Sequence, residues 1–181
     1  MAYLGLDCSS PYLALALVTG GAAHSSCEEV GRDHARRLTG ALDALFAEAR
    51  LSPRDLTGVA VGVGPGSYTG LRVGVAAAQG ISQSLSLPLR GDSSLLAMAA
   101  TALTRTAPRG VVALDARRGN AYAGIFALTP EGPVLEGELL KAARGALQEL
   151  GLPYFENVPP DARYLARRAA LGANAVVPIY L

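Results

Sequence analysis

The stretch VGVGPGSYTGLRVG, residues 61–74, joins an apolar segment to a glycine-rich turn and then to a run with helical character. The apolar run Gly58–Val63 predicts a buried strand, because it is short, continuous and bounded by turn residues. Ser67 or Thr69 can cap a helix that continues to about Leu85. A strand that turns at once into a helix is the repeating unit of α/β folds, so the sequence predicts an α/β protein.

The glycine turn leaves two interpretations open. A helix start after such a turn presents free N–H groups and a partial positive charge, which suits an anion. The stretch lacks the lysine of a P-loop, however. It also departs from the dinucleotide fingerprint, since Gly64, Gly66 and Gly70 are spaced one residue too widely and Pro65 stands among them. The residues favour a tight packing turn and leave a phosphate site as the alternative.

Small residues recur every four positions along the expected helix, at Gly70, Gly74 and Ala78. Such a stripe lets another backbone approach closely. Each glycine inside a helix costs about 1 kcal/mol relative to alanine, so close packing is expected to offset that cost. The neighbouring surface is either the chain's own sheet or a second protein, and the sequence supports both.

The rest of the first half predicts a meander followed by two further helices. Strands are expected at Tyr3–Asp7, Leu13–Val18 and Ala22–Val30. Asp33 can cap a helix that runs to about Leu51. Its apolar stripe consists of Leu38, Ala41, Leu42, Leu45 and Ala49. A third helix is expected at Ser94–Leu103, beginning at Asp92 or Ser93.

The second half repeats the order of the first after a linker at Thr104–Gly110. Strands are expected at Val111–Asp115, Asn120–Leu128 and Pro133–Leu139, and helices at about Ala142–Leu150 and Asp161–Leu171. Two α/β units of similar order, 1–104 and 105–181, indicate an actin-like or ribonuclease-H-like duplicated fold.

Composition excludes several classes of function. The net charge of +1 gives no broad electrostatic case for nucleic-acid or membrane binding. Cys8 and Cys27 form neither a metal motif nor a disulfide framework, and His24 and His34 lack the spacing of a zinc pair. The apolar start is too short for a signal sequence, and no apolar run has transmembrane length. We therefore expect a cytoplasmic protein that binds no membrane.

Two further segments carry polar groups at strand ends. LGLDCSS, residues 4–10, places Asp7 where actin-fold ATPases meet Mg–phosphate, but Ser9 stands where those proteins have glycine. A hairpin turn stabilised by Asp7 and serine is the alternative. DARR, residues 115–118, could bind an anion, although the residues favour an ordinary exposed turn.

Three motifs together resemble one family. GVGPGSYTGLRVG (62–74), LPLRGDSSLLAMA (87–99) and DARRGNAY (115–122) are similar to the TsaB family, also called YeaZ, and so are the first strand and the final VPIYL. The resemblance implies an actin-like ATPase fold with two lobes. It also implies a non-catalytic subunit in the synthesis of N6-threonylcarbamoyladenosine (t6A) in tRNA, which forms a heterodimer with a TsaD-type transferase and is joined by a TsaE-type ATPase.

The resemblance also implies which residues act. It places a partner interface on the first two long helices, at His34, Leu38, Ala41, Leu42, Leu45, Thr69, Gly70, Arg72, Val73, Gly74, Ala77 and Ala78. A degenerate nucleotide site would comprise Asp7, Ser9, Ser10, Gly64 and Gly66. The metal-binding histidine pair of TsaD is missing from Ser93–Met98. ATP and metal are therefore expected in the partner subunits and not in this one, and tRNA is expected to bind through the complex.

Some alternatives and departures remain. The chain could instead be a stand-alone metallopeptidase-like or ATP-binding enzyme of the same superfamily. It could also form a homodimer when alone. The second lobe is short for the family, with the missing length between Leu128 and Pro160, and Asp92 places a charge where the family usually has an apolar residue.

Overall fold

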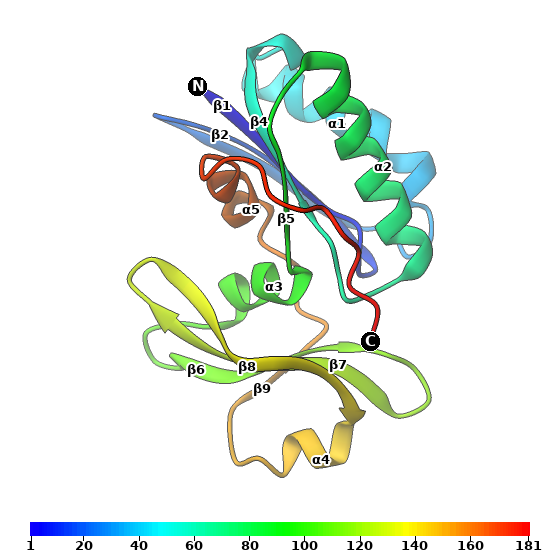
Figure 1. Cartoon of the computed structure of the whole chain (residues 1–181), viewed down its shortest axis with the longest axis vertical. Coiled ribbons are helices and arrows are strands. Elements are labelled where there is room, and N and C mark those ends of the chain that lie inside the picture. The colour runs from blue at the N-terminus through cyan, green and yellow to red at the C-terminus, as the bar shows by residue number, and fades with distance from the viewer.

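The computed structural model describes all residues, 1–181, and forms two lobes, each built on one sheet (Figure 1). The first sheet has the strand order β3-β2-β1-β4-β5, and the second has the order β8-β7-β6-β9. The strands of the first sheet are β1 (Ala2–Asp7), β2 (Tyr12–Thr19), β3 (Ala23–Glu29), β4 (Leu56–Gly62) and β5 (Leu89–Asp92). Those of the second are β6 (Arg109–Asp115), β7 (Asn120–Thr129), β8 (Gly132–Ala143) and β9 (Tyr154–Glu156).

Five α-helices and one 3-10 turn complete the fold. They are α1 (His34–Ala49), η1 (Pro53–Asp55), α2 (Tyr68–Leu85), α3 (Ser94–Ala102), α4 (Arg144–Gln148) and α5 (Ala162–Ala169). Helices α1 and α2 lie on one face of the first sheet and α5 lies on the other, while α3 lies between the lobes (Figure 1). No helix combines the length and the apolar character needed to cross a bilayer.

The two faces of the first sheet differ in side-chain size. Leucines and valines point toward α1 and α2 and form the main core. On the opposite face the sheet presents Gly5, Ala14, Ala16 and Ala60, against which α5 packs. A side chain at Gly5 would place its Cβ only 2.2 Å from the carbonyl oxygen of Ala162, so the absence of one lets the helix approach closely.

Helix α5 corrects the expected division of the chain. The prediction of lobes at 1–104 and 105–181 assigns α5 to the second lobe, yet α5 packs on β1, β2 and β4 of the first. The tail after α5 follows it along β5, where the side chain of Asn174 accepts from Gly91 N at 2.7 Å and donates to Gly91 O at 2.9 Å. The first lobe is therefore closed by the last twenty residues or so of the sequence.

The predicted duplication is confirmed by topology. In each sheet three antiparallel strands come first, and the next strand pairs parallel with the first of them, as β4 does with β1 and β9 with β6. The short strands β5 and β9 were not predicted. The helix expected at Ala142–Leu150 is reduced to α4, because Ala142 and Ala143 belong to the end of β8.

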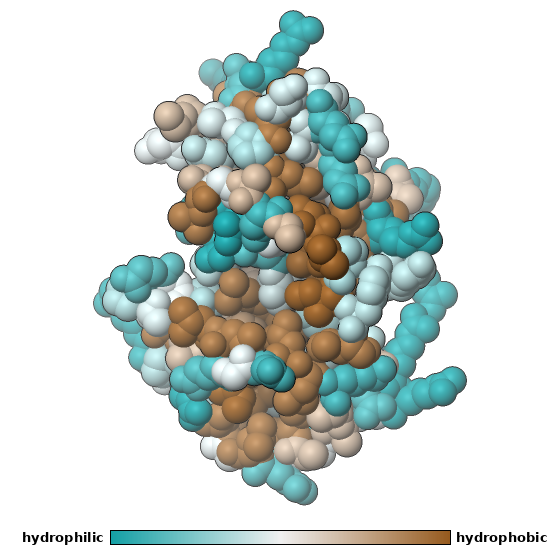
Figure 2. Space-filling view, viewed as in Figure 1, coloured by the Kyte–Doolittle hydropathy of each residue, from teal (hydrophilic) through white to brown (hydrophobic).

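Strand β8 is an unpaired edge of the second sheet. Apolar side chains gather over this lobe on the side facing the viewer in Figure 2, and Val134, Leu135 and Leu140 of β8 are among the exposed ones. Its pairing with β7 is interrupted by a bulge between Ala123 and Ile125. A bulge distorts an edge strand and discourages pairing with another sheet.

Candidate functional site: the helix face and the interlobe cleft

Two glycines of α2, Gly70 and Gly74, face the chain's own first strand and the turn that follows it. A Cβ at Gly70 would lie 2.0 Å from the carbonyl oxygen of Cys8, and one at Gly74 would lie 3.2 Å from the Cys8 Cβ. Ala78 is fully buried. The interface predicted at Gly70, Gly74 and Ala78 is therefore wrong for this stripe, because its small size serves packing within the chain.

The same contacts explain the glycine-rich turn. Gly66 lies against Ser9, whose carbonyl oxygen accepts from Ser67 N at 2.7 Å. The Ser67 hydroxyl caps α2 by accepting from Gly70 N at 3.3 Å. Glycines 66, 70 and 74 thus let the start of α2 close against the turn that follows β1.

The other residues predicted for the interface divide by exposure. His34, Leu38 and Leu45 are buried, and His34 Nε2 lies 3.1 Å from the carbonyl oxygen of Tyr12, to which its N–H can donate. Half-buried positions are Ala41, Leu42, Val73 and Ala77, while Thr69 and Arg72 are exposed. The capping role predicted for Asp33 is also absent, because its carboxylate pairs with Arg36 instead.

The outward face of α2 is almost uncharged. Arg72 is the only charged residue in this 18-residue helix. The exposed positions beyond it include Ala76, Gln79 and Gly80, and Gly80 has no atom within 4 Å of the position of an added Cβ. A solvent-facing helix side normally carries charges, whereas the centres of protein interfaces are depleted of them. Sequence reasoning missed Ala76 and Gly80 because it followed the more conspicuous stripe on the opposite side of the helix.

Asp7 is buried beneath the turn that follows β1 and has no contact with solvent. It is fully buried, and its Oδ1 accepts from the backbone N–H and the hydroxyl of Ser9, each at 2.7 Å. Its Oδ2 makes no hydrogen bond and is directed at Gly62, where an added Cβ would lie 1.7 Å away, beside the hydroxyl of Ser94. Burial raises the pKa of Asp7, and the hydroxyls of Ser94 and Ser9 act in the opposite direction.

The burial of Asp7 predicts a pH-dependent stability. For a carboxyl whose pKa is raised above 3.8 on folding, the stabilising contribution is present below 3.8 and is lost as pH rises through the folded pKa. Asp7→Asn cannot ionise and keeps an oxygen that accepts from Ser9. We expect its stability relative to wild type to increase with pH, by about 1.4 kcal/mol for each unit of pKa shift.

Urea unfolding of wild type and Asp7→Asn at about pH 4.5, 6 and 7.5 measures this difference. The two proteins share every other ionisable residue, so the comparison isolates the carboxyl of Asp7. A difference in unfolding free energy that stays constant with pH would show that the buried carboxyl is not the titrating group.

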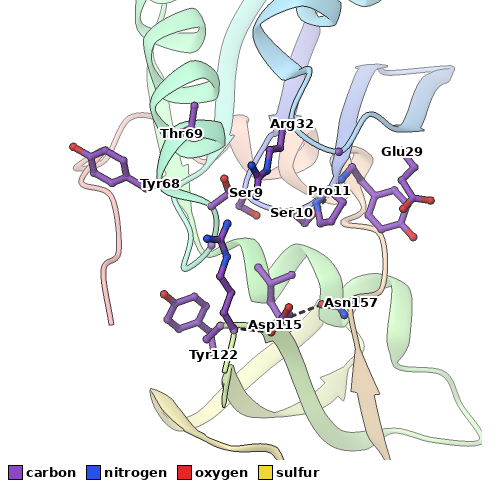
Figure 3. A pocket seen from close by; sticks show the side chains of 17 residues that line it. Ser9, Ser10, Pro11, Glu29, Arg32, Tyr68, Thr69, Asp115, Tyr122 and Asn157 are labelled. Carbon is purple, nitrogen blue, oxygen red and sulfur yellow. Dashed lines mark hydrogen bonds between the residues drawn. The ribbon is translucent and has the colours of Figure 1, made fainter. Parts of the chain in front are cut away.

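A polar cleft of about 750 Å³ separates the lobes (Figure 3). Ser9, Ser10 and Gly66 line it from the first lobe, together with Arg32. Asp7 and Gly64, the other members of the predicted nucleotide site, do not line it. The cleft therefore offers hydroxyls and a guanidinium from the first lobe, but not the carboxylate through which actin-fold ATPases meet Mg–phosphate.

The DARR segment forms the facing wall of the cleft. Arg117 and Arg118 have φ of 66° and 53°, which L-residues rarely adopt. Asp115 holds the turn, since its Oδ1 accepts from Arg117 N at 2.7 Å and pairs with the Arg144 guanidinium at 2.7 Å. The sequence favoured an ordinary turn here, and only the folding of the two lobes brings it opposite Ser9 and Ser10.

Metal-ligating side chains do not cluster. No three of the histidine, cysteine, aspartate and glutamate side chains lie close enough to hold one ion. His24 pairs with Glu48 across 3.2 Å, and burial raises the pKa of the Cys8 thiol.

Two lobes of the same strand order on either side of a cleft define a protein of the actin-like ATPase superfamily. A sequence profile described as "TsaD: tRNA N6-adenosine threonylcarbamoyltransferase" matches residues 26–167. The structure is similar to that of YeaZ from Pseudomonas aeruginosa, with a TM-score of 0.86, 25% identity and 99% of both chains covered. The chain belongs to the TsaB/YeaZ family, as its motifs predicted.

Curated relatives agree with this assignment. The chain is 33% identical over 123 residues to the tRNA threonylcarbamoyladenosine biosynthesis protein TsaB of Escherichia coli K12, covering 67% of this chain and 53% of that one. It is also 33% identical over 129 residues to TsaB of Bacillus subtilis 168, covering 70% and 55%. The matches thus span about half the length of these relatives, whereas the solved Pseudomonas chain has the same extent as this one.

Proposed function

We propose that this chain is a non-catalytic subunit of the machinery that makes t6A in tRNA, and that it binds a TsaD-type transferase through the outward face of α1 and α2. The nearly uncharged outward face of α2 carries the proposal. The names of the matched relatives support the pathway, since TsaB of Escherichia coli and of Bacillus subtilis is described as a threonylcarbamoyladenosine biosynthesis protein.

The composition of this face fits helix-to-helix docking. Ala76 and Gly80 on α2, and Gly40 and Ala44 on α1, are exposed small residues. Small side chains let a partner helix approach to close backbone distance, and the near absence of charge on α2 lowers the cost of removing water there. The inward stripe of Gly70, Gly74 and Ala78 supports this face from behind.

The catalytic groups of the complex would lie outside this chain. Asp7 is buried and does not line the cleft, and this counts against an independent Mg-ATP site of the superfamily type. We therefore assign ATP and metal to the TsaD-type and TsaE-type partners. The complex would act in the cytoplasm, where tRNA is modified.

A pair of matched substitutions tests the interface. Ala76→Glu places a charge on the outward face of α2, and Ala146→Glu places the same charge on an exposed position of α4 in the other lobe. We expect Ala76→Glu to weaken binding to the cognate TsaD-type protein at least tenfold, because the carboxylate would be buried without a partner. Ala146→Glu should bind as wild type does.

Size-exclusion chromatography with light scattering, on each variant alone and mixed with the transferase, gives the result. Both variants should have the melting temperature of wild type within about 2 °C, since neither position contributes to the core. A one-to-one complex of undiminished affinity with Ala76→Glu would contradict the proposed face. Any homodimer of the free chain should be disrupted by the same substitution.

A further inference from the structure

We infer that the interlobe cleft binds a single-stranded segment of RNA, with a phosphate between Arg32 and Arg117 and bases against Tyr68 and Tyr122. This inference rests on the proposed role in tRNA modification and adds that this chain touches the RNA itself. All four residues line the cleft, with Arg32 and Tyr68 from the first lobe and Arg117 and Tyr122 from the second. Figure 3 shows Arg32 reaching toward Ser9 and Ser10 at the boundary between the lobes.

Two arginines of the cleft have no acidic partner, since neither Arg32 nor Arg117 forms an ion pair with a carboxylate. The Asp115 carboxylate pairs with Arg144 at 2.7 Å and accepts from Arg117 N, so it is engaged within its own lobe and not by the Arg117 guanidinium. Glu29 is the other acid of the lining, and it lies at the opposite end of the cleft from Tyr68 in Figure 3. The serine hydroxyls of the first lobe add neutral donors to the same space.

The second-lobe turn holds Arg117 in a costly conformation. A non-glycine residue with φ of 66° is unfavourable and persists only where its surroundings hold it. Here Asp115 accepts from Arg117 N, Asn157 Oδ1 accepts from Asp115 N at 3.0 Å, and Arg144 N donates to the Gly119 carbonyl oxygen at 3.0 Å. The turn is therefore rigid and positions the Arg117 guanidinium at the cleft.

Two of the tyrosines that line the cleft, Tyr68 and Tyr122, lie next to cations. Tyr68 is 59% exposed, with the Arg72 guanidinium 5.3 Å from its ring centre and the Tyr180 ring 5.7 Å away. Lys141 lies 5.4 Å from the centre of the Tyr122 ring. Single-stranded nucleic acid is bound in this way, by stacking on aromatic rings and by cations along the backbone. Arg72 also continues this surface onto the proposed partner face.

An RNA strand fits the cleft better than a free nucleotide does. A Mg-nucleotide site of the superfamily type would use the carboxylate at the end of β1, and Asp7 is buried and does not line the cleft. The exposed position of Tyr68 at the rim suits a strand that enters and leaves, because such a chain continues beyond the cleft. Binding should therefore be independent of magnesium.

Fluorescence anisotropy with a labelled single-stranded RNA octamer, on the full chain, tests the inference. We expect micromolar affinity that is unchanged by EDTA and falls with salt, as expected for phosphate contacts. Arg32→Gln combined with Arg117→Gly should weaken binding at least tenfold, and glycine suits the positive φ at 117, so folding is retained. Tyr68→Ala should weaken it about tenfold, whereas the exposed Arg105→Gln, outside the cleft, should not.

Four results would overturn the inference. The first is absence of octamer binding by wild type, and the second is octamer binding that the cleft variants leave unchanged. The others are equal affinity for double-stranded RNA and displacement of the octamer by adenosine monophosphate at the concentration at which the octamer binds. The same variants should still form the heterodimer with the transferase, so a failure of RNA binding is separable from a failure of the proposed function.

Discussion

Gly70→Ala is expected to destabilise the protein by about 4 kcal/mol, although it adds a single methyl group. The added Cβ, whose position is fixed by the backbone of α2, would lie 2.0 Å from the backbone carbonyl oxygen of Cys8. Neither can move without separating α2 from the turn after β1, so relaxation by a side-chain rotation is not available. Overpacking usually costs 1–3 kcal/mol, and a backbone clash of this kind falls above that range.

The same helix provides graded controls. At Gly74 the nearest atom to an added Cβ is the Cys8 Cβ at 3.2 Å, so Gly74→Ala should cost less than Gly70→Ala. At Gly80 nothing lies within 4 Å, and Gly80→Ala should stabilise the protein by about 1 kcal/mol through helix propensity. Thermal and urea unfolding of the three variants should therefore rank Gly70 lowest and Gly80 highest.

The opposite result would place the stripe of Gly70, Gly74 and Ala78 on the partner-binding surface. If Gly70→Ala and Gly74→Ala unfolded like wild type but lost binding to the transferase, the stripe would be part of the interface after all. A charge at Gly74 is not a clean test of binding, because it would disturb the core before it reached a partner.

Asp92→Asn is expected to lower the unfolding free energy by about 3 kcal/mol. Asp92 is buried, and its two oxygens pair with Arg90 Nε at 2.8 Å and with Arg168 Nη2 at 2.9 Å. Removing one partner of a buried pair typically costs 3–5 kcal/mol, because the remaining charge is left uncompensated. The arginines keep some exposure, which places the cost at the lower end of that range.

The loss of stability in Asp92→Asn should arise from the contact of Asp92 on β5 with Arg168 on α5. Arg168→Met should also destabilise, and the double variant should lose less than the sum of the two, since the residues are in contact. Asp43→Asn, on the exposed side of α1, is the matched control and should change stability by less than about 0.5 kcal/mol. Additive effects of Asp92→Asn and Arg168→Met would mean that the pair does not connect α5 to the sheet.

Local patterns predicted most of the first lobe. The meander, α1 and α2 follow from short apolar runs, glycine turns and a 3.6-residue stripe, because these signals lie within a few neighbouring residues. Strands β5 and β9 were missed because each has only three or four residues and is stabilised by a parallel neighbour distant in sequence. The charge at Asp92 had no explanation in sequence, since its partner Arg168 lies 76 residues away.

The sequence by itself determined the fold class, the duplication and the family, because strand order and motif spacing are written along the chain. Only the tertiary structure decided which side of each helix or turn is buried in the chain and which side lies on the surface or in the cleft. Gly70 and Gly74 of α2 face the first sheet and not a partner, α5 packs on the first lobe, and the DARR turn lies opposite Ser9. The physical reason is that periodicity distinguishes the two faces of a helix or strand. It does not say which element packs on each face, because that depends on contacts between residues far apart in the chain.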